Sequence, residues 1–427
     1  MKGGGPNHRH GHCSKKALVM LRLAIISAIA AIVVIALIVL CVVRWDAWFG
    51  NPGEAPYDAP ATPARVMLTF GDSHPDSRNI SWTCGTDVKP SCVSLIDTAD
   101  TTRISIQATG ETFASRSGKA AYYVARLRHL RQGHTYRYRV TTANRHSPWH
   151  TFRMPQTDRR TLSFIYSGDI QDTTGGIANS LLRQAFRSHP DAQLLICGGD
   201  LTERPTDAFW GETFCSLDSI CQSLPVMTAA GNHEYLKGIK CEMERRFDLI
   251  HSYYLDSMED DNHVFTLTLG PAQFFVLDSN RELPYLLQQA DWLKKALSNS
   301  RAQWKIIVMH HPLYSLRGKY NNILQRWVFN PIIRKHGVDL VLQGHEHAYG
   351  RRLSRDAAGR ATTPLYITST CSPKFYRIKH RGYHDKAIAD KRMLQKVSIA
   401  GDTLTTTAFD PLSGQIYDSL SIVKKRN

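Results

Sequence analysis

The sequence predicts three parts in order: an N-terminal transmembrane helix, an all-β sandwich and an α/β domain. Residues 23–43 form an apolar run without a charge, which is long enough to cross a bilayer. From about residue 65 to 155, short alternating runs are broken by Gly, Asp, Asn and Pro, with no helical stretch between them. From about residue 161, apolar strands alternate with segments of helical spacing.

The first part is predicted to be a membrane anchor. Residues 1–16 form a basic, His-rich tail without a core, which we expect to be disordered. Its histidines suit a solvated tail better than a metal site. Residues 17–44 form the transmembrane anchor, and the aromatic residues that follow it belong to the membrane interface: Trp45, Trp48 and Phe49.

The positive charges lie mainly before the anchor, so the positive-inside rule predicts a single-pass protein with a cytoplasmic N-terminus. The remainder would then lie outside the cytoplasm, in a periplasm, a lumen or the cell exterior. A cleaved signal peptide is the competing interpretation, with Ala59-Pro60-Ala61 as its small-residue site, but the apolar run is long for one. Residues 45–63, rich in Pro, Gly and Ala, are predicted to be a linker.

The second part, residues 64–156, is predicted to be a small β-sandwich. In residues 136–140, tyrosine and valine alternate with arginine, which is the period of a half-buried strand. About ninety residues of such short strands are typical of a sandwich. The cysteine spacing is compatible with small disulfide loops, Cys84 with Cys92 and Cys215 with Cys221.

The third part, residues 160–424, is predicted to be an α/β domain. Continuous apolar strands, expected to be buried on both faces, are predicted at 162–167, 194–197, 304–309 and 338–342, with a hairpin at 265–277. Helices are predicted at 177–188, 286–297 and 323–335. Alternating runs at 393–424 complete a second sheet.

Five short polar motifs follow these apolar runs and carry the chemistry. Together they supply carboxylates, one carboxamide and several imidazoles, the oxygen and nitrogen ligands of first-row metal ions. Polar loops at strand ends are where open α/β sheets bind ligands. The sequence therefore predicts a dinuclear metal site from these motifs: Gly168-Asp169-Ile170, Gly199-Asp200-Leu201, Gly231-Asn232-His233-Glu234, Met309-His310-His311-Pro312 and Gly344-His345-Glu346-His347.

The net charge of +16 does not by itself indicate a nucleic-acid partner. Lys and Arg are spread along the chain and form no stripe interleaved with aromatic residues. We expect no nucleic-acid binding, and we expect the charge to attract anionic substrates or membrane headgroups. The sequence gives no oligomeric state.

The order of the five motifs resembles that of the calcineurin-like metallophosphoesterase superfamily, whose catalytic domain is a β-sandwich flanked by helices. Residues 127–138 resemble the closing strands of a fibronectin type III domain, and the two domains together are similar to purple acid phosphatases. The resemblance implies that Asp200 bridges two metals. It assigns Asp169 and His347 to the first metal, and assigns three ligands to the second: Asn232, His310 and His345. His233 would contact phosphate or protonate the leaving oxygen.

Two positions depart from the family pattern. Purple acid phosphatases carry a metal-binding tyrosine where this chain has Glu203, and other members carry a histidine where it has Gln171. Gln171 or a water would complete the first metal's shell, with Glu203 a weaker candidate. We therefore expect two divalent ions (manganese, zinc or ferrous iron) and a colourless protein. Arg317 and Lys319 follow His310 where plant enzymes carry phosphate-binding histidines, so they are candidates for substrate binding.

These observations predict a membrane-anchored, extracytoplasmic phosphoester hydrolase that uses metal-activated hydroxide. Its substrate would be a phosphorylated small molecule or another phosphoester. A phosphodiesterase rather than a phosphomonoesterase is an alternative, because the motifs describe the metals and not the pocket. The other alternative is a catalytically inactive relative that binds a partner through its fibronectin-like domain.

Overall fold

The computed structural model describes residues 10–51, 53–156, 158–253, 255–258, 261–380 and 382–424, with side chains from Leu18 onward except at Asp261. The chain divides into two compact units. The first contains Met1–Pro52 with Lys237–Lys240, and the second contains Gly53–Leu236 with Cys241–Asn427. Both predicted globular domains therefore lie in the second unit.

The first unit is dominated by helix α1, His10–Phe49. Its stretch from Leu18 to Phe49 is long and apolar enough to cross a membrane, which suits a transmembrane or signal-anchor segment. Helix α1 extends beyond the predicted anchor at both ends. The prediction of a disordered tail through residue 16 is wrong for residues 10–16, which form the beginning of helix α1. Residues 1–9 of that tail lie outside the described part of the chain.

The predicted linker is only partly a linker. Helix α1 includes residues 45–49, and from Glu54 the chain is attached to the second unit. The Glu54 carboxylate lies 2.6 Å from the buried Arg246 guanidinium, and the Tyr57 N–H donates to the Ser117 carbonyl. A segment rich in Pro and Gly forms little regular structure, but its polar and aromatic side chains still bind the domain.

Residues 64–153 form the predicted β-sandwich. One sheet has the order β1-β2-β6-β5, with strands Ala64–Thr69, Arg78–Thr83, Gly118–Leu127 and Thr109–Ser115. The other has the order β4-β3-β7-β8, and β9 also pairs with β7; the strands are Arg103–Gln107, Ser91–Asp97, Thr135–Thr142, Arg145–His146 and His150–Arg153. Trp82 stacks on Tyr123 in the buried core between the sheets.

The α/β domain is built on two sheets. The six-stranded sheet has the order β12-β11-β10-β23-β24-β25, with strands Val226–Thr228, Leu195–Cys197, Thr161–Ser167, Leu394–Ala400, Thr403–Phe409 and Ile416–Val423. The eight-stranded sheet has the order β15-β16-β17-β18-β19-β21-β20-β22, with strands Asp256–Met258, Asp261–Leu269, Ala272–Leu277, Trp304–Met309, Leu340–Gln343, Ala361–Thr368, Tyr349–Arg355 and Lys386–Ile388. Strands β13 (Tyr235–Leu236) and β14 (Glu242–Met243) form a small hairpin.

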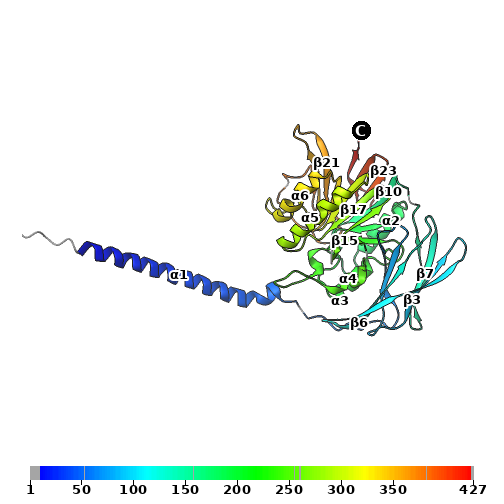
Figure 1. Ribbon diagram of the computed structural model, residues 1–427, viewed down its shortest axis with the longest axis horizontal. Helices are drawn as coiled ribbons and strands as arrows, with labels where there is room; N and C mark the ends of the chain where they lie inside the picture. Colours follow the sequence, from blue (N-terminus) through cyan, green and yellow to red (C-terminus); the bar gives the residue numbers. More distant parts are fainter. Residues whose placement is uncertain are drawn as a thin grey trace, which may run out of the picture. The chain divides into compact units, whose positions relative to one another are not determined.

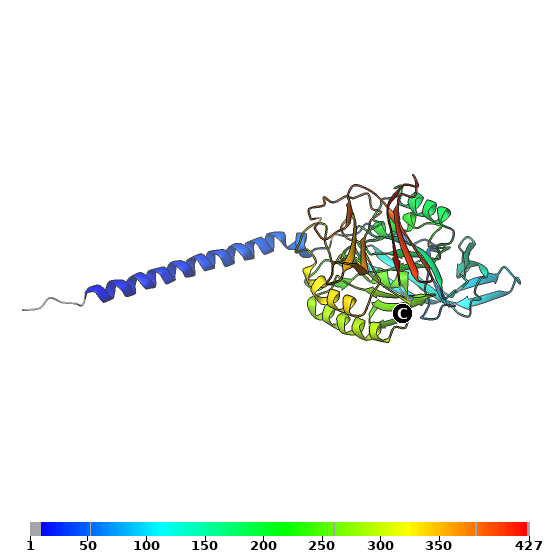
Figure 2. The ribbon, with the colours of Figure 1, turned by 90° about the horizontal axis from the view of Figure 1, so that it is seen from above.

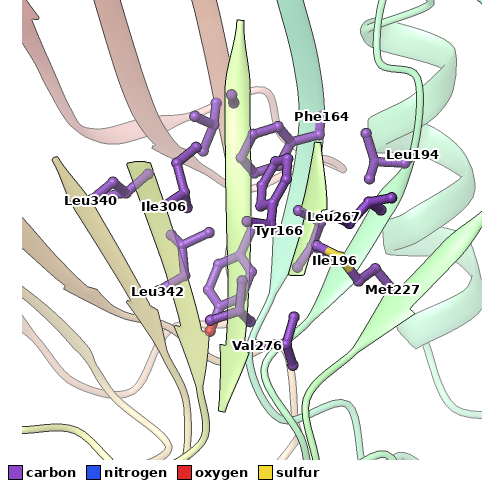
Figure 3. Close-up of a cluster of buried hydrophobic side chains, with 14 of the residues drawn as sticks. Phe164, Tyr166, Leu194, Ile196, Met227, Leu267, Val276, Ile306, Leu340 and Leu342 are labelled. Carbon is purple, nitrogen blue, oxygen red and sulfur yellow. The ribbon is translucent and has the colours of Figure 1, made fainter. Parts of the chain in front are cut away.

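The two sheets face each other across one hydrophobic core. Phe164, Tyr166 and Ile196 point from the six-stranded sheet toward Val276 and Ile306 of the eight-stranded sheet (Figure 3). Alternate residues of the same strands, such as Ile165 and Leu195, point to the opposite face. The predicted sandwich architecture of this domain is confirmed.

Helices cover the outer face of each sheet. Helices α5 (Leu283–Asn299) and α6 (Ile323–Lys335) lie side by side and pack on the eight-stranded sheet (Figures 1 and 2). Helices α2 (Ala178–Ser188), α3 (Asp207–Ser216) and α4 (Arg245–His251) contribute to the core on the other side. The sequence did not predict α3, which carries Gly211 in its middle, or α4, which is only two turns long.

Neither of the disulfide loops that the cysteine spacing would allow is formed. All cysteines from Cys41 onward are free thiols. Cys84 follows β2 of one sheet, whereas Cys92 lies in β3 of the other. The Cys221 thiol is buried and donates to the Val66 carbonyl, whereas Cys215 is exposed. Closeness in sequence therefore does not bring these sulfur atoms together.

Candidate metal centre

The five polar motifs gather where the two sheets meet. Three of them follow the carboxyl ends of β10, β11 and β12, and two follow β18 and β19. Each set of strands runs parallel, so its carboxyl ends share one edge of the sheet. Glycines allow close approach here: a Cβ on Gly168 would lie 1.8 Å from the Ser369 carbonyl, and one on Gly231 would lie 2.2 Å from the Asp200 nitrogen.

One group of ligand atoms converges closely. His310 Nε2 lies 3.1 Å from Asn232 Oδ1, 3.1 Å from His345 Nδ1 and 3.2 Å from Asp200 Oδ2. His345 Nδ1 lies 2.9 Å from Asn232 Oδ1. One atom each from Asp200, His310 and His345 lie within 4.8 Å of one another, a spacing that can hold a metal ion. The structure thus brings together four predicted ligands.

The hydrogen bonding of His310 favours a metal at this point. Its Nδ1–H donates to the Gly198 carbonyl at 2.8 Å, which leaves Nε2 to face the other ligand atoms. Burial lowers the pKa of His310, but the Asp200 and Asp169 carboxylates outweigh burial and raise the pKa to about 10. A proton on His310 therefore balances the acidic charge of the metal-free site. A cation would supply the same positive charge, so these residues fit a metal ion.

A second group lies around Asp169. His347 Nε2 is 3.5 Å from Asp169 Oδ2, and the His345 N–H donates to Asp169 Oδ1 at 2.8 Å. Asp169 Oδ2 is buried without a hydrogen-bond partner among the described residues. Burial raises the pKa of Asp169 to about 8; His310 opposes this rise and Asp200 adds to it. A buried, unpartnered carboxylate oxygen beside an imidazole also fits a metal ion.

Gln171 lies near this second group. Its amide donates to the Thr202 carbonyl at 3.0 Å, while Oε1 is buried without a described partner. That oxygen is available for a metal or a water molecule. Glu203 differs, because its carboxylate pairs with Lys374.

His233 is oriented from two sides. Its backbone N–H donates to Asp200 Oδ1 at 2.9 Å, and its Nδ1–H donates to the Glu203 carbonyl. Its Nε2 lies 3.9 Å from Asp200 Oδ2, and its side chain is 29% exposed. Burial raises the pKa of Asp200, but His310 and His233 outweigh it and hold that pKa well below its ordinary value. His233 therefore borders the ligand cluster and also reaches solvent.

Two buried glutamates hold the loops in place, and the sequence analysis gave them no role. The Glu234 carboxylate accepts the Gly231 N–H and three N–H groups of the loop after β11: Asp200, Leu201 and Thr202. The Glu346 carboxylate accepts the Ser315 hydroxyl and the Leu316 N–H. A glutamate inside each motif could have indicated this role, because a glutamate is rarely buried unless its carboxylate is paired.

The two predicted substrate-binding residues differ in their placement. The Arg317 guanidinium stacks 4.7 Å from the centroid of the Tyr376 ring, and that ring lies 4.5 Å from the His347 ring. Lys319 Nζ instead lies 5.7 Å from the ring of Tyr320, which is 72% exposed. Arg317 therefore contacts Tyr376, which in turn contacts His347. Lys319 instead lies over the ring of the exposed Tyr320.

Comparison with known families supports the same domain layout. The model of the calcineurin-like phosphoesterase family matches residues 162–349. The model of the purple acid phosphatase N-terminal domain matches residues 63–154. The boundary between the two matches falls where β9 ends and β10 begins.

Similar proteins include acid phosphatases from plants and from Homo sapiens. Purple acid phosphatase 18 of Arabidopsis thaliana is 25% identical over 48% of this chain, which spans about half of that relative's length. Acid phosphatase type 7 of Homo sapiens is 25% identical over 68% of this chain and 71% of its own length. A purple acid phosphatase from yellow lupin seeds shares the fold, with a TM-score of 0.72 and 17% identity over 86% of this chain and 75% of the lupin chain. This chain thus combines a calcineurin-like phosphoesterase domain with a purple acid phosphatase N-terminal domain.

Proposed function

We propose that this protein is a membrane-anchored, extracytoplasmic phosphoester hydrolase with a dinuclear metal site. The observation that carries the proposal is the convergence of Asp200, Asn232 and His345 on His310 Nε2, at distances of 3.1–3.2 Å. Such crowding of oxygen and nitrogen lone pairs is stabilised by a cation. Purple acid phosphatases are metal-dependent hydrolases, and the domain match supports the same chemistry here.

In this proposal Asp200 bridges the two ions. Asp169 and His347 bind the first ion, with Gln171 or water completing its shell, and Asn232, His310 and His345 bind the second. The ions are manganese, zinc or ferrous iron. Bound at these residues, such ions would supply positive charge toward phosphate oxygens and make water more acidic. Glu203 in place of a tyrosine means that the iron-loaded protein lacks a tyrosinate band in its visible spectrum.

His233 would serve as the proton donor. The bond from its Nδ1–H to the Glu203 carbonyl leaves Nε2 facing the ligand cluster. A group held in this way is suited to protonating the leaving oxygen. Arg317 and Lys319 would contribute positive charge toward the phosphoester, with Arg317 the better placed of the two.

The anchor and its orientation are also part of the proposal. Leu18–Phe49 would span the membrane, with the basic N-terminal residues in the cytoplasm and both globular domains outside. Fractionation with membranes, and protease access to the globular domains from the extracytoplasmic side, would test this topology.

The experiment that tests the activity uses the full chain in detergent. The protein is stripped of metal, reloaded with manganese, zinc or iron, and assayed on p-nitrophenyl phosphate and bis-p-nitrophenyl phosphate. Metal-dependent turnover that is lost in Asp200→Asn is expected, and the ratio of the two rates distinguishes a monoesterase from a diesterase. Absence of both metal binding and turnover would overturn the proposal and favour an inactive binding protein.

A further inference from the structure

An ion pair lies beside the candidate metal centre and is formed by residues other than the six proposed metal ligands. Glu203 follows the bridging Asp200 by three positions, and its carboxylate pairs with Lys374. The same Glu203 accepts the Nδ1–H of His233 on its backbone carbonyl. Its side chain is 34% exposed and that of Lys374 is 35% exposed, so solvent reaches both charges.

Lys374 belongs to an irregular segment, residues 372–380, that packs against the site. We call residues 372–380 the rim segment. Its Tyr376 ring lies 4.5 Å from the His347 ring, and the Tyr376 N–H donates to the His347 carbonyl. The N–H groups of Lys379 and His380 both donate to the Leu316 carbonyl at 2.9 Å. The rim segment is therefore attached both to a ligand loop and to the loop that carries Arg317.

Lys374 is electrostatically close to the ligand cluster. Lys374 lies two positions before Tyr376, whose ring is 4.5 Å from the His347 ring and whose N–H donates to the His347 carbonyl. A cation on this segment attracts an anion bound next to His347.

Arg317 supplies a second positive charge on the same rim. Its guanidinium stacks on Tyr376, and no described carboxylate forms an ion pair with it. The Leu316 N–H donates to the Glu346 carboxylate. This bond fixes the backbone immediately before Arg317. The rim therefore carries two cations: Lys374, which is paired with Glu203, and Arg317, which is stacked on Tyr376.

This ion pair is partly exposed, so it can exchange partners more readily than a buried pair, because water screens both charges. A carboxylate or phosphate group on a bound molecule can therefore replace Glu203 as the partner of Lys374. The Glu203 carbonyl remains bonded to His233 during this exchange, since the carboxylate and the carbonyl are separate groups.

We propose that Lys374 and Arg317 bind a second anionic group in the leaving portion of the substrate. The preferred substrates are then phosphoesters whose leaving group itself carries a carboxylate or phosphate. This inference rests on the proposed hydrolase function, and it names the substrate class of that site.

A matched pair of substrates tests the inference: 4-carboxyphenyl phosphate and 4-carbamoylphenyl phosphate, which differ in the charge of one group. With the metal-reloaded full chain, Lys374→Met should lower kcat/KM for the carboxylate about tenfold and change the carboxamide less than twofold. Glu203→Gln should raise kcat/KM for the carboxylate, because the competing acid is lost. Comparing variants cancels any intrinsic difference between the leaving groups.

Lys379→Met is the matched control, since Lys379 is an exposed lysine of the same rim segment. It should leave the ratio of the two kcat/KM values unchanged. If Lys374→Met leaves the ratio of the two kcat/KM values unchanged, whether or not both values fall, the inference is overturned while the hydrolase proposal stands.

A binding measurement separates the inference from hydrolysis itself. Calorimetry should show that 4-carboxybenzylphosphonate binds more tightly than 4-carbamoylbenzylphosphonate. In Lys374→Met the two phosphonates should bind with equal affinity. Preference in binding without turnover would retain the rim site and reject the hydrolase. Equal affinity of the two phosphonates, or no binding of either, would reject the rim site.

Discussion

The Glu234 carboxylate accepts four backbone N–H groups from the segments that carry Asp200 and Asn232. It is fully buried, and burial raises its pKa. Although Glu234 is not a predicted ligand, it fixes the backbone from which two proposed ligands project. Its role is structural support for the loops that carry them.

Replacing Glu234 with glutamine should therefore destabilise the metal-free protein. One carboxylate oxygen becomes an NH2 group, which cannot accept hydrogen bonds from the backbone N–H groups. Buried backbone donors therefore lose their acceptor, which lowers the free energy of unfolding by about 1–3 kcal/mol. Urea denaturation of the metal-free protein measures this change. Glu242→Gln, at an exposed position of β14, is the control, and equal midpoints for the two variants would contradict the assigned role.

His233 and Asp200 should separate turnover from metal binding. We expect His233→Ala to retain two metals per chain and to lose turnover by roughly 10²–10⁴-fold, the contribution of a general acid. Asp200→Asn should instead release metal, because a bridging carboxylate is lost. Metal content by elemental analysis, alongside kcat, distinguishes the two. Equal metal loss in both variants would mean that their roles are wrongly assigned.

Among the elements, α4 carries a buried histidine at its C-terminal end. His251 is fully buried among Phe247, Tyr253 and Trp210, and its Nδ1–H donates to the Phe247 carbonyl. Burial lowers its pKa from 6.5 to about 4. The folded protein therefore holds His251 neutral at pH values where the unfolded chain protonates it.

This difference predicts a loss of stability in acid. Because the folded pKa is depressed, the stabilisation is present above pH 6.5 and is lost as the pH falls toward 4. A shift of this size corresponds to about 3 kcal/mol. Unfolding free energies measured between pH 7 and 4 should fall less steeply for His251→Gln, which keeps a neutral N–H donor. An unchanged slope would mean that other groups govern the acid transition.

The elements also show what the sequence can predict. Helices α2, α5 and α6 have clear apolar faces, and the structure confirms them within about three residues at each end. Helix α3 has no such stripe, because its aromatic residues are not confined to one face and Gly211 lies among them. The six proposed ligands were found because each follows a strand in a short motif. The Glu203–Lys374 pair joins residues 171 positions apart, and no local pattern encodes such a pairing.

At the scale of the whole molecule, a buried ionic cluster joins three parts of the chain. The fully buried Arg246 contacts Glu54 from the segment after α1, Asp207 from α3 and Glu244 before α4. Asp207 also pairs with Arg65 of the β-sandwich. The sandwich, the α/β domain and the segment that leads to the anchor therefore share one set of buried charges.

We predict that a soluble fragment starting at Gly53 is more stable than one starting at Asp58. The shorter fragment lacks Glu54 and leaves Arg246 with two acidic partners. We expect its free energy of unfolding to be lower by about 2 kcal/mol, which is less than the loss of an isolated buried pair because two acids remain. Thermal unfolding of both fragments measures the difference, and Glu54→Gln in the longer fragment should reproduce most of it. Equal stability would show that the cluster does not depend on Glu54.

The backbone of the metal centre has a consequence for how this chain evolves. Asp200, His345 and His347 have positive φ values of 51°, 72° and 45°, in the region that glycine occupies most easily. Glycine at these positions would relieve local strain while removing a metal donor. Stability alone therefore favours glycine at these positions. The strained backbone is offset only if the side chains contribute something else, and the proposed metal binding would be that contribution.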